Sequence, residues 1–124
     1  MVFQWGEFGK IAQNLYQFGQ RDSKLCEAAY RCAISRSYYA AFHHLRIIGE
    51  IERRRPFSKT GTAHSEVIDY FSKHADRQKQ VAGNNLLQLK RNRRKSDYVE
   101  STKISDGTAQ FSIALSNQIY QNIR

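Results

Sequence analysis

An all-α fold is predicted for this chain: an antiparallel up-and-down bundle of about five helices, forming a single domain over residues 1–124. Apolar residues recur at steps of three and four along most of the sequence, and no window shows the apolar–polar alternation of a half-buried strand. The chain contains only one proline, which leaves long stretches free to be helical. A chain of 124 residues can bury one hydrophobic core but not two.

The first two helices are predicted from apolar spacing and from the residues that bound them. The first covers residues 5–18 and is expected to end at Gly19. The second begins at residues 22–23, which are good N-caps, and ends at about Arg54, because Pro56 disfavours helical geometry in the residue before it. Its many alanines let neighbouring helices approach closely, so we expect it to be the central helix of the bundle.

Three further helices complete the predicted bundle. Thr62 is a candidate cap for the third, and a polar stretch over residues 76–83 is expected to follow it. The fourth is expected to begin at residues 84–85 and to run through a basic segment to Tyr98. The fifth is expected from about Thr108, with apolar residues at helical spacing up to the C-terminus.

The basic residues are unevenly distributed along the chain. There are 20 Lys and Arg against 11 Asp and Glu, a formal charge of +9. The segment from Arg77 to Lys95 has seven basic residues and no acidic one, and the segment from Arg53 to Lys59 has four more. Such clusters are a candidate surface for a polyanion, first of all a nucleic acid. The alternative is a solvated face that keeps a small protein soluble.

Several kinds of site have no support in the sequence. It lacks a glycine-rich phosphate loop, a CxxC pair and the HExxH and GxSxG motifs. His43 and His44 are adjacent, and so point about 100° apart on a helix, and the other histidines lie far along the chain; no metal and no cofactor is expected.

Cys26 and Cys32 would lie about 9 Å apart on one helix, too far for a disulfide, and are expected in or near the core. With no bilayer-length apolar run and no leader-like start, a soluble, cytoplasmic protein without membrane contact is predicted.

One cluster of residues on the second helix suggests a specific contact. Arg36, Tyr39 and His43 share one helical face, because spacings of three, four and seven residues return to the same side. An arginine buried among aromatic residues needs an anionic partner, and Asp97 near the end of the fourth helix is a suitable one. An ion pair between Arg36 and Asp97 is therefore predicted. The alternative is that Asp97 only offsets Arg93 and Arg94, one turn before it.

The same residues carry a resemblance to a known family. The segment RCAISRSYYAAFHHL, the later HSEVIDYF and the segment from Leu86 to Tyr98 resemble the HEPN superfamily (higher eukaryotes and prokaryotes nucleotide-binding), most closely its small prokaryotic branch with an RxYYAxFH helix and an RxxxDY signature. The two signatures are Arg36–His43 and Arg93–Tyr98, and the resemblance covers residues 25–98 in the expected order. It implies a helical bundle, homodimerisation and a role in prokaryotic toxin–antitoxin or defence systems, often beside a minimal nucleotidyltransferase antitoxin.

The resemblance also implies RNA as a partner, because many relatives are metal-independent endoribonucleases. Their activity needs an Arg and a later His with four to six residues between them, which supply phosphate binding and proton transfer. Here Asp97 occupies the histidine position of the late helix, and the one formal match is Arg36 with His43. Candidate catalytic residues are therefore Arg36, His43, Arg93 and Asp97, in a chain that is either a ribonuclease or a degenerate one. The structural alternative has Arg36 in the ion pair and His43 hydrogen-bonded at the surface.

Binding residues and the remaining functional hypotheses follow from these patterns. Tyr98 occupies the position at which some partner nucleotidyltransferases add adenylyl groups; its alternative is a core tyrosine. A non-catalytic dimeric interaction module that docks a nucleotidyltransferase is the second functional hypothesis, and DNA binding by the basic helix is the third. The candidate nucleic-acid-binding residues are Lys90, Arg91, Arg93, Arg94, Lys95, Arg53, Arg54 and Arg55.

Overall fold

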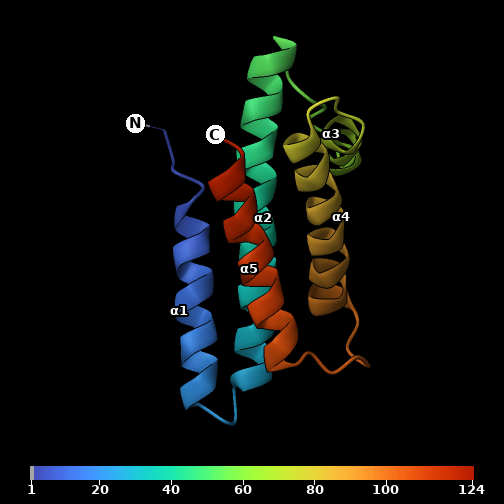
Figure 1. The fold of residues 1–124 in the computed structure, drawn as a ribbon. Helices are drawn as coiled ribbons and strands as arrows, with labels where there is room; N and C mark the ends of the chain where they lie inside the picture. The colour runs from blue at the N-terminus through green and yellow to red at the C-terminus, as the bar shows by residue number, and fades with distance from the viewer. Residues whose placement is uncertain (1) are drawn as a thin grey trace.

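The structure is a computed structural model that describes residues 2–124, and it consists of five helices joined by short segments (Figure 1). The four long helices lie side by side with alternating directions, and the short third helix lies beside the upper part of the fourth. No strand occurs in the described residues, so the prediction of an all-α bundle of five helices is confirmed. The helices are α1 (Glu7–Arg21), α2 (Cys26–Arg53), α3 (Ala63–Ser72), α4 (Arg77–Tyr98) and α5 (Asp106–Asn122).

Helix α2 is the centre of the bundle, since it packs against each of the other four helices. Its alanines at 29, 33, 40 and 41 are buried, and the small side chains bring α5 close enough for direct bonds to the α2 backbone. The Tyr120 hydroxyl donates to the carbonyl of Ala40 at 2.9 Å, and the Ser116 hydroxyl donates to the carbonyl of Ser37 at 2.9 Å.

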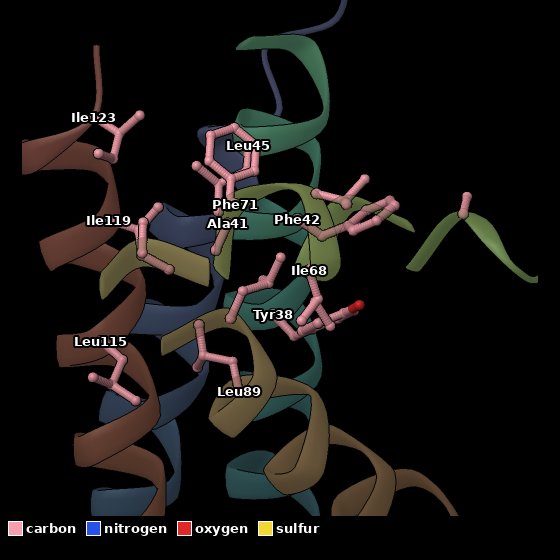
Figure 2. Close-up of a cluster of buried hydrophobic side chains, with 14 of the residues drawn as sticks. Tyr38, Ala41, Phe42, Leu45, Ile68, Phe71, Leu89, Leu115, Ile119 and Ile123 are labelled. Atoms are coloured by element: carbon pink, nitrogen blue, oxygen red, sulfur yellow. The ribbon is translucent and has the colours of Figure 1, made fainter. Parts of the chain in front are cut away.

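The largest hydrophobic cluster lies where α2, α3, α4 and α5 meet (Figure 2). Burial of these side chains is the main stabilising contribution to the arrangement. A second, smaller set of contacts around Tyr30 and Ile34 joins α2 to α1 and to the start of α5. Members of the large cluster include Tyr38, Phe42, Leu45, Val67, Ile68, Phe71, Leu86, Leu89, Leu115 and Ile119.

The N-cap of helix α4 is Asp76, eight residues before the first of the two caps predicted for it at residues 84–85. The Asp76 carboxylate accepts hydrogen bonds from the backbone N–H groups of Gln78 and Lys79, which are otherwise unpaired at a helix start. Gly83 lies inside the helix, where a Cβ would come within 2.3 Å of the Ser72 backbone nitrogen. The glycine therefore marks the close approach of α3 and α4, not a break.

Three other sequence expectations are corrected by packing. Helix α1 continues through Gly19 to Arg21, because Gly19 is buried against Tyr30, where a Cβ would meet the ring at 2.7 Å. Cys32 is exposed rather than in or near the core, and no disulfide joins it to Cys26. Phe111, at a predicted apolar position of the last helix, is 52% exposed because it faces away from the bundle.

Arg31 of α2 anchors the segment between α4 and α5. Its guanidinium donates to the carbonyls of Ser96 at 2.9 Å, Val99 at 3.2 Å and Thr102 at 2.5 Å. Glu27 pairs with this guanidinium at 3.1 Å and also accepts the N–H of Ile104. These contacts satisfy carbonyls at the C-terminal end of α4, which have no partner within the helix, and they fix how the basic half of α4 is presented.

Candidate functional site

The second half of α4 presents a cationic face to solvent. Arg91, Arg94, Lys95 and Tyr98 are all exposed, and their spacing of three, four and seven residues places them on one side of the helix. No carboxylate in residues 2–124 pairs with any of these three cations. The Tyr98 side chain is 73% exposed, so the alternative of a core tyrosine is wrong. We call Arg91, Arg94, Lys95 and Tyr98 the α4 stripe.

Arg93 starts from another face of α4 and is buried in the bundle, although its guanidinium also reaches the ring of Tyr98. Its guanidinium carbon lies over the rings of Tyr38, Tyr39 and Tyr98, at 5.2, 5.6 and 5.8 Å from their centroids. Asp97, one turn later, is 3.8 Å from it. Arg93 was a candidate for both nucleic-acid binding and catalysis, but it is only 8% exposed, so it is not presented to solvent as the α4 stripe is.

The predicted ion pair between Arg36 and Asp97 is absent, and Ser35 stands between the two charges. The Arg36 guanidinium donates to the Ser35 hydroxyl at 3.3 Å, and that hydroxyl donates to the Asp97 carboxylate at 3.3 Å. Asp97 instead pairs with Arg93, because the i, i+4 spacing on α4 brings these two together without a contact across helices. Arg36 and Asp97 therefore line one surface pocket of about 450 Å³ without touching.

The Arg36, Tyr39 and His43 face of α2 is covered by aromatic side chains from the start of the chain. Trp5 stacks on the His43 imidazole with ring centroids 3.6 Å apart, and the Phe8 ring lies 4.9 Å from the Arg36 guanidinium carbon. The His43 Nδ1 atom accepts a hydrogen bond from Arg46 Nε at 3.1 Å. Arg36 and His43 are thus separate side chains held by different neighbours, and the structure does not bring them together as a pair.

His43 does share a groove with a histidine that the sequence analysis left without a role. His43 of α2 and His64 of α3 both line a groove of about 460 Å³, together with Arg46, Glu50 and Lys59. The His64 Nδ1 atom is 2.6 Å from the hydroxyl of Tyr38, and its ring stacks on Phe42. Only the packing of α3 against α2 reveals this site; the sequence signal was a histidine in the first turn after the predicted Thr62 cap.

Burial and nearby cations keep both histidines of this groove neutral. Burial, Arg46 and His64 lower the pKa of His43 to about 4. Burial, Arg93 and Lys90 lower the pKa of His64. Lys90 is itself half-buried, and its pKa is lowered by burial and by Arg94 and Arg93. At neutral pH the imidazoles can therefore act as hydrogen-bond donors or acceptors, but they carry no charge.

The second basic segment of the sequence is divided by its packing. The Arg53 guanidinium stacks on Phe57 with its carbon 4.0 Å from the ring centroid. Arg54 has φ 58° and forms the left-handed C-cap of α2, and its side chain is exposed. Arg55 is exposed and lines a wide pocket of about 710 Å³ with Tyr70 and Lys73. Arg54 and Arg55 remain available to a ligand, whereas Arg53 is held against an aromatic ring.

A metal site, a membrane-spanning helix and similarity to known proteins were each looked for in the described residues, and none was found. In residues 2–124, no three His, Cys, Asp or Glu side chains gather as a metal site would require. None of the helices in that range combines the length and the apolar content of a bilayer span. Comparisons with protein-family models, curated proteins and solved structures give no match to this chain.

Proposed function

We propose that this chain is an RNA-directed, HEPN-like helical protein that acts as the toxin-like component of a prokaryotic toxin–antitoxin or defence system. The observation that supports it best is the α4 stripe: three unpaired, exposed cations and an exposed tyrosine on one helical face. Cations spaced along a helix can neutralise successive phosphates of a nucleic acid. An exposed aromatic ring beside them can stack on an unpaired base, which favours single-stranded RNA over duplex DNA.

We propose RNA binding without cleavage, that is, a degenerate ribonuclease. A metal-independent ribonuclease needs a group to remove the proton of the 2′-hydroxyl and a group to protonate the leaving oxygen. Asp97 pairs with Arg93, and a carboxylate at that position would repel phosphate. His43 is stacked under Trp5 with its Nδ1 atom already accepting from Arg46, so this nitrogen is not free to act as the general base toward a 2′-hydroxyl.

Salt-dependent binding tests the proposal. A fluorescent single-stranded RNA should bind the purified protein in a salt-dependent way. A plot of the logarithm of the binding constant against the logarithm of the salt concentration should have a slope of about −2, because each of three neutralised phosphates contributes about −0.7. Arg91→Ala should reduce the slope by about 0.7 and weaken binding at low salt. Arg21→Ala, which removes an exposed arginine from α1, a helix with no contact to α4 in the described residues, is the matched control. Binding absent at low salt, or equal loss in both variants, would contradict the proposal.

A second candidate, a dimeric interaction module that docks a minimal nucleotidyltransferase, is favoured by apolar side chains left on the surface. Val2 is 76% exposed, Phe3 48%, Ile47 36% and Ile51 72%. Val2, Phe3 and Ile47 line one pocket, and Ile51 lies one turn beyond Ile47 on α2. Exposed apolar residues gathered in this way are typical of protein interfaces. Light scattering of the wild type and of Ile47→Glu should show whether an assembly exists and whether this surface holds it.

Tyr98 is the residue that we propose such a nucleotidyltransferase would modify. Its exposed ring at the end of the α4 stripe makes the hydroxyl accessible, and an added adenylyl group would bring negative charge beside Arg94 and Lys95, where RNA phosphates would bind. The intact mass of the protein co-expressed with a minimal nucleotidyltransferase, compared with that of Tyr98→Phe, tests this assignment.

A further inference from the structure

The groove shared by His43 and His64 is built from three parts of the chain. It lies between the second half of α2, the segment that follows it and the start of α3, and its volume is about 460 Å³. His43, Arg46 and Glu50 come from α2, Lys59 from the connecting segment and His64 from α3. The groove is separate from the α4 stripe, although Lys90 and Arg93 of α4 lie close enough to His64 to lower its pKa.

The hydrogen bonds at Nδ1 decide where each imidazole carries its proton. Arg46 Nε donates to His43 Nδ1, so the neutral His43 ring has its N–H at Nε2. The Tyr38 side chain is fully buried, and His64 Nδ1 is the only partner of its hydroxyl within residues 2–124. Burial raises the pKa of Tyr38, so the hydroxyl keeps its proton and donates it to Nδ1. The neutral His64 ring therefore also has its N–H at Nε2.

Both Nε2–H groups are free donors that solvent can reach. Neither has a hydrogen-bond partner in residues 2–124, and neither belongs to the buried unpaired polar atoms, which are Ser37 Oγ, Arg53 Nη1 and Arg93 Nε. Two residues from different helices that line one groove thus each carry an Nε2–H donor without an acceptor in residues 2–124.

The charges around the groove favour an anion as the missing acceptor. The Lys59 ammonium group is exposed at the groove and pairs with no carboxylate of the described residues. Glu50, the carboxylate among the residues that line the groove, is already engaged by Arg46 at 2.9 Å and by the Phe57 N–H at 3.0 Å. Glu66 of α3 is likewise engaged, by the N–H of Ser58 and the hydroxyl of Thr62.

We propose that the His43–His64 groove is a phosphate-binding site, in which the two Nε2–H groups and the Lys59 ammonium bind phosphate oxygens. The RNA identity of that phosphate rests on the proposed function: the site would hold a backbone phosphate of the strand bound at the α4 stripe. Burial first, and then cations on α2 and α4, lower the pKa values of the two rings in the free protein. A bound phosphate would favour the imidazolium form, so phosphate binding raises both histidine pKa values and is tighter at lower pH.

Histidine NMR with inorganic phosphate as the probe tests the site directly. The Nε2 resonances of His43 and His64 should shift saturably with phosphate at constant ionic strength, and both pKa values should rise by about one unit, which corresponds to about tenfold tighter binding to the protonated ring. His44, bonded to the Ile123 carbonyl, and His74, bonded to Glu52, lie outside the groove and serve as internal references. Equal shifts in all four histidines, or no saturable shift, would overturn the proposal.

Matched variants separate this site from general charge effects and from the proposed RNA surface. Lys59→Ala should weaken phosphate binding at least threefold, whereas Lys73→Ala, the same change at the C-cap of α3 and outside the groove, should leave it unchanged. Equal loss in both would overturn the site. Arg91→Ala on the α4 stripe should weaken RNA binding and leave the phosphate titration intact. Histidine shifts with phosphate but none with a short single-stranded RNA would overturn RNA as the source of the phosphate, without removing the groove as a phosphate site.

Discussion

Arg93 and Arg94 are sequence neighbours with opposite environments, and their substitution should separate stability from binding. Arg93 is buried over Tyr38 and pairs with Asp97, whereas Arg94 is exposed in the α4 stripe. Arg93→Ala should lower the free energy of unfolding by roughly 3 kcal/mol, because it leaves a cavity and a partly buried carboxylate without its cation. Arg94→Ala should change it by less than about 0.5 kcal/mol. Urea unfolding followed by circular dichroism measures both.

The same two variants should have the reverse order of effect on the affinity for RNA. Arg94→Ala is expected to weaken binding to single-stranded RNA, and Arg93→Ala, measured where it remains folded, should bind as the wild type does. Similar unfolding free energies for the two variants would show that Arg93 is not the structural residue that its position indicates.

At the scale of elements, replacing a helical glycine by alanine should have opposite effects on stability at two positions, Gly83 and Gly9. Gly83 of α4 faces α3, where a Cβ would lie 2.3 Å from the Ser72 nitrogen and 2.7 Å from the Phe71 carbonyl carbon. Within residues 2–124, Gly9 of α1 has no neighbouring atom within 4 Å of the corresponding position. Gly83→Ala should destabilise by about 1–3 kcal/mol because backbone atoms must move, and Gly9→Ala should stabilise by about 0.5–1 kcal/mol because alanine favours the helix.

Thermal unfolding of the two alanine variants decides the matter. The transition temperature should fall for Gly83→Ala and rise for Gly9→Ala. A rise in both would mean that α3 and α4 can separate without cost, and the reason given for Gly83 inside α4 would be wrong.

Arg31 holds the segment between α4 and α5 in place by donating hydrogen bonds to its backbone carbonyls, as a capping side chain does at a helix end. Arg31→Ala removes donors to the carbonyls of Ser96, Val99 and Thr102. We expect amide exchange of the 99–104 segment to accelerate at least tenfold, because carbonyls left without partners release this segment. Lys103→Ala, which removes a neighbouring exposed cation, should leave exchange unchanged. Equal exchange in the two variants would contradict the anchoring role of Arg31.

Across the whole molecule, local patterns predicted the elements, and tertiary contacts decided where they begin and which side chains meet. Five helices could be predicted because apolar periodicity is a local property. The start of α4 could not, since Asp76, Asn84 and Asn85 are all good N-caps and Gly83 resembles a break until α3 is placed beside it. The exposed side of α4 follows from helical spacing once Leu86 and Leu89 are assigned to the core.

The candidate site was less predictable because it depends on contacts between helices. Arg36 and Asp97 were expected to meet, but the closer Arg93 on the same helix pairs with Asp97. Nothing in the sequence places His64 beside His43, since 20 residues and a change of chain direction separate them. Residues on one helix can be grouped by spacing alone, whereas a groove made by two helices cannot.

The stability of the whole molecule should depend on pH through the two histidines of the groove. His43 has a pKa of about 4 in the folded chain against 6.5 as its ordinary value, and the pKa of His64 is also lowered. The unfolded chain therefore binds more protons below pH 6.5, and the free energy of unfolding should fall as the pH is lowered from 6.5 toward 4. Hydrogen bonds from Lys79, Tyr70 and His74 lower the pKa of Glu52 to about 2. Protonation of Glu52 therefore reduces the free energy of unfolding further only below about pH 4.5. Urea unfolding at pH 7.0, 6.0 and 5.0 isolates the histidine range, where His43→Gln should flatten the decline. A constant free energy of unfolding from pH 7 to pH 5 in the wild type would contradict this account, and with it the burial of two neutral imidazoles beside the cations of α2 and α4.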